Sequence, residues 1–388
     1  MSVTAAQGFV GAGVACGIKA SGDPDLSLVA TADGRPVAAA AVFTANKSTA
    51  APVVVSRSHL EATGGRAAGV ILNSGNANAA TGAAGKDASE RMCAAAAAQL
   101  GCKPSEVLVC STGLIGIPLD VTKIEAAAAA LASARSVDGG ADAARAILTT
   151  DTHAKEVVVR SGAFTVGGMA KGAAMLAPNM ATMLAVLTTD AAAEPESLKA
   201  MLQAAVSQSF NTLSVDGCTS TNDTVIVLAS GLAGPVDDAE LGMALAAACT
   251  DLAEQMAGDA EGATKVVRIK VVGATSDEEA ARGARKVAES QLCKCSWYGQ
   301  DPYWGRIASE LGSAGIDYDP DTVAISYGGV VVAEGGITIE HDEAKVREHM
   351  AGRHLDIVAD LNLGGTGTGS ILTNDLTHAY VDENMGTS

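Results

Sequence analysis

The stretch KGAAMLAPNMATML, residues 171–184, decides how the rest of this chain is interpreted. Pro178 and Asn179 disfavour the continuation of a helix, and Ala181 is a small residue directly before Thr182. The carbonyl carbon of Ala181 is therefore open to attack by the hydroxyl group of Thr182. From residue 181 to residue 189 apolar and polar residues nearly alternate, which is typical of a half-buried strand.

A threonine inside a chain is a poor nucleophile because it has no base of its own. A threonine at a chain start carries an α-amine with a pKa of about 7.7 to 8, which takes up the hydroxyl proton near neutral pH. Cleavage of the bond between Ala181 and Thr182 would create such a residue. The four residues ATML alone favour an ordinary threonine in a strand, so the interpretation depends on the sequence around them.

The stretch at 171–184 closely resembles the signature KGxGMxxPNMATML of the ornithine acetyltransferases of arginine biosynthesis. These glutamate N-acetyltransferases belong with the self-processing, N-terminal-nucleophile amidohydrolases. Six further blocks resemble family counterparts in the same order, and they are spread over nearly the whole chain. The blocks are residues 43–46, 73–78, 111–116, 214–217, 220–224 and 301–306.

The resemblance implies an enzyme that moves the acetyl group from N2-acetyl-L-ornithine to L-glutamate by a ping-pong mechanism with an acetyl-Thr182 intermediate. It implies no metal ion and no organic cofactor. It also implies an α/β fold, a layered αββα sandwich with mixed sheets that resembles the DmpA aminopeptidases. Self-cleavage would give an α chain, 1–181, and a β chain, 182–388, which includes an α/β portion from about residue 265 and stays associated with the α chain as α2β2.

The resemblance also assigns roles to single residues. Thr112 and Gly113 match the oxyanion hole of the family, although such a pair alone is typical of a plain turn. Substrate contacts of the family fall on Thr152, Lys171, Thr182, Glu261, Asn384 and Ser388. Lys171 suits the carboxylate of acetylornithine and Glu261 suits its distal ammonium, with proton transfer as an alternative role for Glu261. Without the resemblance, both are interpreted as surface residues.

Two departures from the family pattern concern the fit of the substrate. Ala174 stands where the family usually has glycine, which adds a methyl group beside the active segment. The tail after Glu383 is one residue shorter than usual and lacks the family's tyrosine.

Composition restricts the partners and the compartment. The formal charge of −18 disfavours nucleic acid and anionic membranes and favours small cationic or zwitterionic substrates. No secretory leader and no run of about 18 apolar residues is present, so a cytoplasmic protein is expected. Eight scattered cysteines predict buried, reduced thiols, and the spacing of Cys293 and Cys295 is wrong for zinc.

The hydrophobic pattern predicts interleaved strands and helices. Strands are predicted at 28–30, 37–43, 53–55, 70–72, 107–110, 224–228, 265–272, 323–326 and 330–332. Helices are predicted at 88–100, starting at Asp87 or Ser89, and at 120–134, 195–208, 239–256 and 276–289. Since strands occur outside a strict βαβ order, mixed or antiparallel sheets layered with helices are expected.

Three alternatives to the simple transferase remain open at this point. An amidase or aminopeptidase of the same nucleophile class would use water in place of glutamate. A bifunctional enzyme would also use acetyl-CoA to acetylate glutamate, as an amino-acid N-acetyltransferase. An unprocessed binding protein on the same fold would keep the bond before Thr182 intact.

Overall fold

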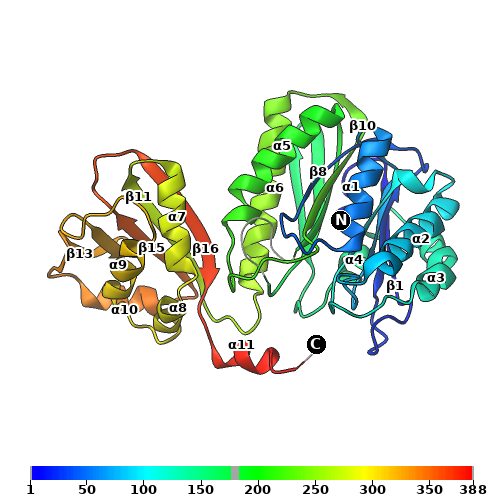
Figure 1. The fold of residues 1–388 in the computed structure, drawn as a ribbon. Coiled ribbons are helices and arrows are strands. Elements are labelled where there is room, and N and C mark those ends of the chain that lie inside the picture. The colour runs from blue at the N-terminus through cyan, green and yellow to red at the C-terminus, as the bar shows by residue number, and fades with distance from the viewer. Residues whose placement is uncertain (1, 176–182, 387–388) are drawn as a thin grey trace. The chain divides into compact units, whose positions relative to one another are not determined.

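A computed structural model describes residues 2–175 and 183–386 of the chain. Three predicted site residues, Ala181, Thr182 and Ser388, lie outside the described residues. The chain forms two compact units, each with its own sheets and helices (Figure 1). The first unit comprises the described residues up to 211 together with 219–256, and the second comprises 212–218 and 257–386.

The first unit contains a four-stranded and a six-stranded sheet, both of them mixed. The four-stranded sheet has the order β1 (Phe9–Val14), β2 (Leu26–Thr31), β5 (Gly69–Asn73) and β6 (Val107–Ser111). The six-stranded sheet has the order β4 (Arg66–Ala67), β3 (Val37–Phe43), β10 (Thr224–Pro235), β9 (Leu184–Ala192), β8 (Phe164–Lys171) and β7 (Lys155–Ser161).

The two sheets of the first unit pack face to face. Buried residues such as Val70 and Leu108 of one sheet share a hydrophobic core with Met169 and Val186 of the other. Helices α2 (Gly82–Leu100) and α3 (Val121–Ser133) cover the outer face of the four-stranded sheet, and α5 (Pro195–Gln208) and α6 (Asp238–Gly258) cover that of the six-stranded sheet (Figure 1). The predicted αββα layering with mixed sheets is confirmed.

The second unit is a six-stranded mixed sheet with helices packed on it. Its order is β14 (Ile337–Thr338), β13 (Val330–Glu334), β12 (Ala324–Tyr327), β15 (His354–Asp360), β11 (Val266–Ala274) and β16 (Gly367–Asn374). Its helices are α7 (Asp277–Ala288), α8 (Gln291–Tyr298), α9 (Trp304–Gly312), α10 (Glu343–Ala351) and α11 (His378–Glu383).

Two local predictions are wrong. Residues 53–55, predicted as a strand, lie in helix α1 (Ala51–Thr63). The helical pattern is hidden because two of its buried positions are polar: the Ser56 hydroxyl and the His59 ring contact the carbonyl oxygens of Val109 and Val107 in β6.

Helix α2 begins at Gly82, before the predicted caps Asp87 and Ser89. The Ser89 hydroxyl is buried and donates to the carbonyl oxygen of Gly85, so Ser89 is an interior helix residue that bonds back along its own helix. The remaining predicted helices and strands occur within a few residues of their expected bounds.

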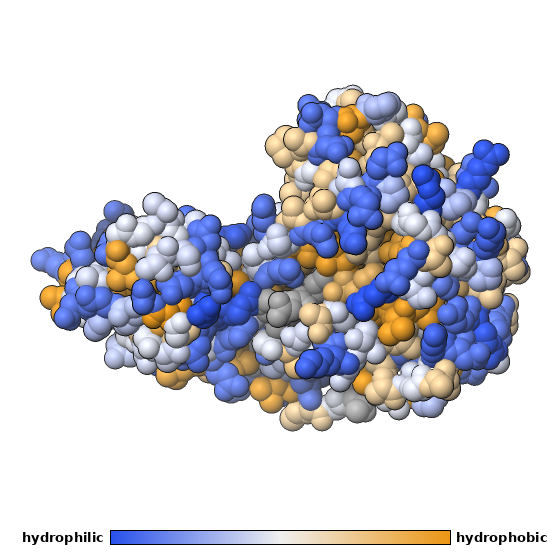
Figure 2. All heavy atoms as spheres, turned by 45° about the horizontal axis from the view of Figure 1, so that its top comes forward, coloured by the Kyte–Doolittle hydropathy of each residue, from blue (hydrophilic) through white to orange (hydrophobic). Residues whose placement is uncertain are grey.

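The face drawn in Figure 2 is mostly hydrophilic with scattered hydrophobic groups. No helix among the described residues is long and apolar enough to cross a membrane.

All eight cysteines are free thiols. Burial raises the pKa of Cys110 to about 12, whereas Cys218 and Cys295 are exposed, so the expectation of buried thiols is wrong for these two.

Candidate active site

The predicted oxyanion residues follow the paired ends of two strands. Strands β5 and β6 are parallel, with Asn73 opposite Ser111. The Ser111 hydroxyl donates to Asn73 Oδ1 at 2.6 Å, and the Thr112 amide donates to the Asn73 carbonyl oxygen at 3.0 Å. These bonds hold Thr112, which is 2% exposed, at the edge of the four-stranded sheet.

Only glycine fits at position 113. Gly113 has a φ of 130°, a conformation that L side chains rarely adopt. A methyl group there would lie 2.4 Å from the carbonyl carbon of Gly75 and 2.5 Å from the amide nitrogen of Asn76. The backbone of this loop is therefore packed closely against residues 73–78, the loop that follows β5.

Lys171 reaches the same place from the six-stranded sheet. It is the last residue of β8, is 3% exposed, and lies opposite Leu184 of β9 in the antiparallel register. Its Nζ donates to the Thr149 hydroxyl at 2.7 Å and to the Thr112 hydroxyl at 3.4 Å. The structure therefore brings together two predicted site residues that are 59 positions apart in the chain.

Asp151 holds this lysine in place. Its side chain is fully buried; Oδ2 lies 3.6 Å from Lys171 Nζ, and Oδ1 accepts from Lys155 Nζ at 2.5 Å and from the Gly172 amide at 2.7 Å. Burial by itself raises the pKa of the Asp151 carboxyl, but the two lysines and the Gly172 amide outweigh it and hold this pKa well below its usual range. The Lys171 ammonium group therefore lies near both the Asp151 carboxylate and the Thr112 hydroxyl.

Asn222 and Asp223, directly before β10, connect the two sheets. The Asn222 amide nitrogen Nδ2 donates to the carbonyl oxygens of Ser111 at 2.9 Å and Ala77 at 2.6 Å. Asp223 Oδ1 accepts from the amide of Met183, the residue that follows Thr182 in the chain, at 3.0 Å. Sequence analysis assigned no role to Asp151, Asn222 or Asp223, although all three lie in or beside segments that it singled out.

The other described site residues are Thr152, Glu261 and Asn384. Thr152 is exposed and follows Asp151 in the chain. In the second unit, Asn384 Nδ2 donates to Glu261 Oε2 at 2.8 Å, which brings this predicted pair together. Burial, Glu261 and Asp259 raise the pKa of Glu383, so the surroundings of Glu261 are negatively charged and suit a cation.

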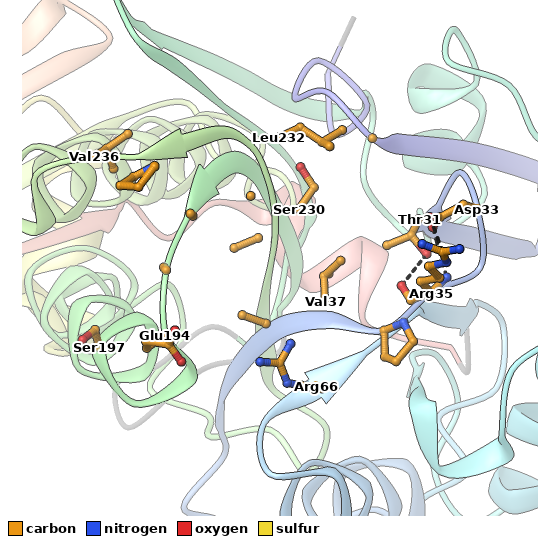
Figure 3. A pocket seen from close by; sticks show the side chains of 18 of the residues that line it. Thr31, Asp33, Arg35, Val37, Arg66, Glu194, Ser197, Ser230, Leu232 and Val236 are labelled. Atoms are coloured by element: carbon orange, nitrogen blue, oxygen red, sulfur yellow. Dashed lines mark hydrogen bonds and ion pairs between the residues drawn. The ribbon is translucent and has the colours of Figure 1, made fainter.

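A separate cavity of about 800 Å³ lies in the first unit. It is lined by Thr31, Val37, Ala192 and residues 229–232 (Figure 3). It therefore lies toward the ends of β9 and β10 that are far from Leu184 and Thr224. No predicted site residue lines this cavity.

Within residues 2–175 and 183–386, no group of three or more His, Cys, Asp or Glu side chains is arranged to hold a metal ion.

Comparison with known protein families matches residues 10–386 to the ArgJ family. The chain belongs to the ArgJ family. It is 45% identical to the arginine biosynthesis bifunctional protein ArgJ of Thermobifida fusca over 389 residues, which cover all of both chains. It is 46% identical to the ArgJ protein of Mycobacterium leprae over 396 residues, which cover all of this chain and 95% of the relative.

Solved structures of ArgJ proteins are also similar. A chain of the ornithine acetyltransferase from Mycobacterium tuberculosis, solved with ornithine, is 47% identical over 46% of this chain and 94% of its own, with a TM-score of 0.44. Membership of the ArgJ family confirms the expectation of an acetyltransferase enzyme of arginine biosynthesis.

Proposed function

We propose that this ArgJ-family chain cuts itself between Ala181 and Thr182 and then transfers acetyl groups through the freed Thr182. The donor is N2-acetyl-L-ornithine and the acceptor is L-glutamate. The observation that carries the proposal is the contact of Lys171 with Thr112, because it places a buried positive charge beside the predicted oxyanion donors. Lys171 is the last residue of β8 and lies opposite Leu184, the first residue of β9, whereas Thr112 follows the last residue of β6.

Self-cleavage begins with attack of the Thr182 hydroxyl on the Ala181 carbonyl carbon. The peptide C–N bond breaks, an ester joins Ala181 to the Thr182 oxygen, and water hydrolyses this ester. The products are a carboxyl group on Ala181 and a free α-amine on Thr182. This amine is the base that an internal threonine lacks.

In the first half-reaction the α-amine takes the hydroxyl proton and the Thr182 oxygen attacks the acetyl carbonyl carbon. The Thr112 hydroxyl and the Gly113 amide stabilise the oxyanion, with the charge of Lys171 behind them. The proton passes to the departing nitrogen, the acetyl C–N bond breaks, and ornithine leaves. In the second half-reaction the amine of glutamate attacks the acetyl-Thr182 ester and the threonine oxygen recovers its proton.

Substrate recognition is shared between both products of the cut. Lys171 and Thr152 precede the cut and suit the substrate carboxylate, while Glu261, supported by Asn384, follows it and suits the ornithine ammonium. Ser388 completes the proposed substrate set. The α chain (1–181) and β chain (182–388) remain associated in a cytoplasmic α2β2 assembly.

Intact-mass analysis tests the proposal directly. The wild type is expected to give two fragments that meet between residues 181 and 182, and brief incubation with acetylornithine is expected to add one acetyl group to the fragment that begins at Thr182. Thr182→Ala is expected to stay whole and to carry no acetyl group, whereas Thr182→Ser keeps a hydroxyl nucleophile and serves as the matched control. An active wild type that remains one polypeptide would contradict the mechanism.

A second activity is favoured by the relatives that are named bifunctional. We propose that acetyl-CoA also acetylates Thr182, so that glutamate is acetylated without acetylornithine. The test supplies acetyl-CoA and glutamate alone and measures acetylglutamate. Free acetate as the main product from acetylornithine and glutamate would instead favour an amidase.

A further inference from the structure

The sequence Thr-Asn-Asp occurs in each of the two compact units. Residues 221–223 lie directly before β10, and residues 373–375 include the end of β16. The asparagine of each copy is buried, since Asn222 is 4% exposed and Asn374 is 1% exposed. The mechanism above uses neither side chain.

Asn222 joins two loops beside the predicted oxyanion donors. Its Nδ2 donates to the carbonyl oxygen of Ala77, in the loop after β5, at 2.6 Å and to that of Ser111, at the end of β6, at 2.9 Å. The Thr221 hydroxyl donates to its Oδ1 at 2.5 Å, which holds the amide group in one orientation. Because Gly113 packs closely against the backbone of the first loop, a shift of either loop would displace it.

Asn374 joins the two ends of the segment that carries Glu261. Its Nδ2 donates to the carbonyl oxygen of Ala257, in the last turn of α6, at 2.8 Å and to that of Lys265, directly before β11, at 2.9 Å. The next residue, Asp375, accepts from the backbone amide of Lys265 at 2.9 Å. The loop that carries Glu261 is therefore held together at both ends.

The two asparagines have the same chemistry but hold different groups. Removal of either side chain would take one shared donor from two carbonyl oxygens of buried residues, and the joined segments would shift to reach other donors. A displacement of about 1 Å at a group that acts in the transition state costs about 100-fold in rate. A displacement of a group that only recognises the substrate raises KM instead. The two substitutions should therefore change different kinetic constants.

We propose that Asn222 and Asn374 are positioning residues for two different parts of the site. Asn222 positions the oxyanion donors Thr112 and Gly113, and Asn374 positions Glu261. The inference rests on the proposed function, which gives those three residues their roles. Each asparagine acts through backbone carbonyl oxygens of its own unit, and neither contacts the substrate.

Alanine substitutions test the inference, and each variant is the matched control of the other because both remove a buried amide that joins two carbonyl oxygens. Asn222→Ala is expected to lower kcat by about 100-fold, with KM for acetylornithine within about 2-fold of wild type. Asn374→Ala is expected to raise this KM by about 10-fold, with kcat within about 3-fold. Intact mass gives the cut fraction, and kcat is expressed per cut molecule. A loss of the same kind in both variants would reduce both asparagines to structural residues.

Double-mutant cycles identify the group through which each asparagine acts. In the Thr112→Ala background, Asn222→Ala is expected to lower kcat by about 10-fold or less, because one of the positioned donors is already absent. In the Glu261→Gln background, Asn374→Ala is expected to change KM by about 2-fold at most. Full single-variant effects in these backgrounds would overturn the inference.

Glutamine variants keep the test decisive if an alanine variant does not fold. Asn222→Gln and Asn374→Gln retain a donating amide but displace it by one methylene group. Each is expected to change the same kinetic constant as its alanine variant, by a smaller factor. The reverse assignment of kcat and KM would contradict the inference. An active wild type that stays uncut would instead overturn the proposed function.

Discussion

Lys171 and Lys294 are two of the four buried lysines among the described residues, and their surroundings differ. Lys171 in the first unit lies 3.6 Å from a buried carboxylate that it shares with Lys155, and it contacts two threonine hydroxyls. Lys294 in the second unit is 5% exposed and donates to the Thr373 hydroxyl and the Asn374 carbonyl oxygen, both at 2.7 Å. Burial lowers the pKa of Lys294 to about 8, against the opposing charges of nearby carboxylates.

The difference shows that burial of a lysine does not by itself mark a functional site. Lys294 joins α8 to β16 and is satisfied by uncharged groups of its own unit. Lys171 belongs to a charged group with Asp151 and Lys155, and it contacts a strand-end hydroxyl. A buried ammonium group in contact with a loop hydroxyl is the feature that suits an oxyanion.

Removal of the shared carboxylate should have the largest effect. Asp151→Asn removes a buried carboxylate that pairs with both Lys155 and Lys171, so we expect the free energy of unfolding to fall by about 3 to 5 kcal/mol. Urea unfolding of the first unit measures this loss. In the Asp151→Asn background, Lys155→Met should recover part of this loss because one buried positive charge is removed. A loss below about 1 kcal/mol for Asp151→Asn would contradict the description of the pair.

Substitution of the two lysines separates them by activity. Lys171→Met removes the positive charge beside Thr112, and we expect kcat/KM with acetylornithine to fall by about 100- to 1000-fold. Lys294→Met is the control of equal burial, and its kcat/KM should stay within about 3-fold of wild type. Equal losses in both variants would remove the functional distinction between the two lysines.

The smallest effect is a pH dependence of stability that comes from Lys294. Because its folded pKa of about 8 lies below the unfolded value of 10.5, the unfolded state binds more protons between these values, and the stability contributed by Lys294 rises with pH in that window. The gain in the free energy of unfolding over this pH window is about 3 kcal/mol at most. The contribution of Lys294 is measured by the Tm difference between wild type and Lys294→Met, followed from pH 7 to about pH 10.5. A difference that falls or stays constant over this range would be inconsistent with a lowered pKa of Lys294.

Much of the fold could be predicted because it depends on local pattern. The hydrophobic runs of β5, β6 and β10 identify them as strands, and Pro195 marks the first turn of α5. Helix α1 could not be predicted in the same way, since its buried Ser56 and His59 are satisfied by a strand about 50 residues away.

The candidate site was predictable only through the resemblance. Thr112, Lys171 and Glu261 were assigned by matching motifs, and the contact of the first two follows from the meeting of two sheets, which no local pattern contains. Asp151 and Asp223 accept from the backbone amides of Gly172 and Met183, which are 21 and 40 residues away in the chain. An isolated carboxylate in a loop gives no signal of such partners in the sequence.

The strand order of the six-stranded sheet has a consequence for a protein cut before residue 182. Strands β9 and β10 would belong to the later fragment, and they lie in the middle of the sheet, between β8 and β3 of the earlier fragment. Separation of the fragments would break the hydrogen bonds between β3 and β10 and between β8 and β9 at once, and it would expose an edge on each of these four strands. The first unit of the cut protein should therefore unfold cooperatively, and fragments produced apart should recover activity only by folding together.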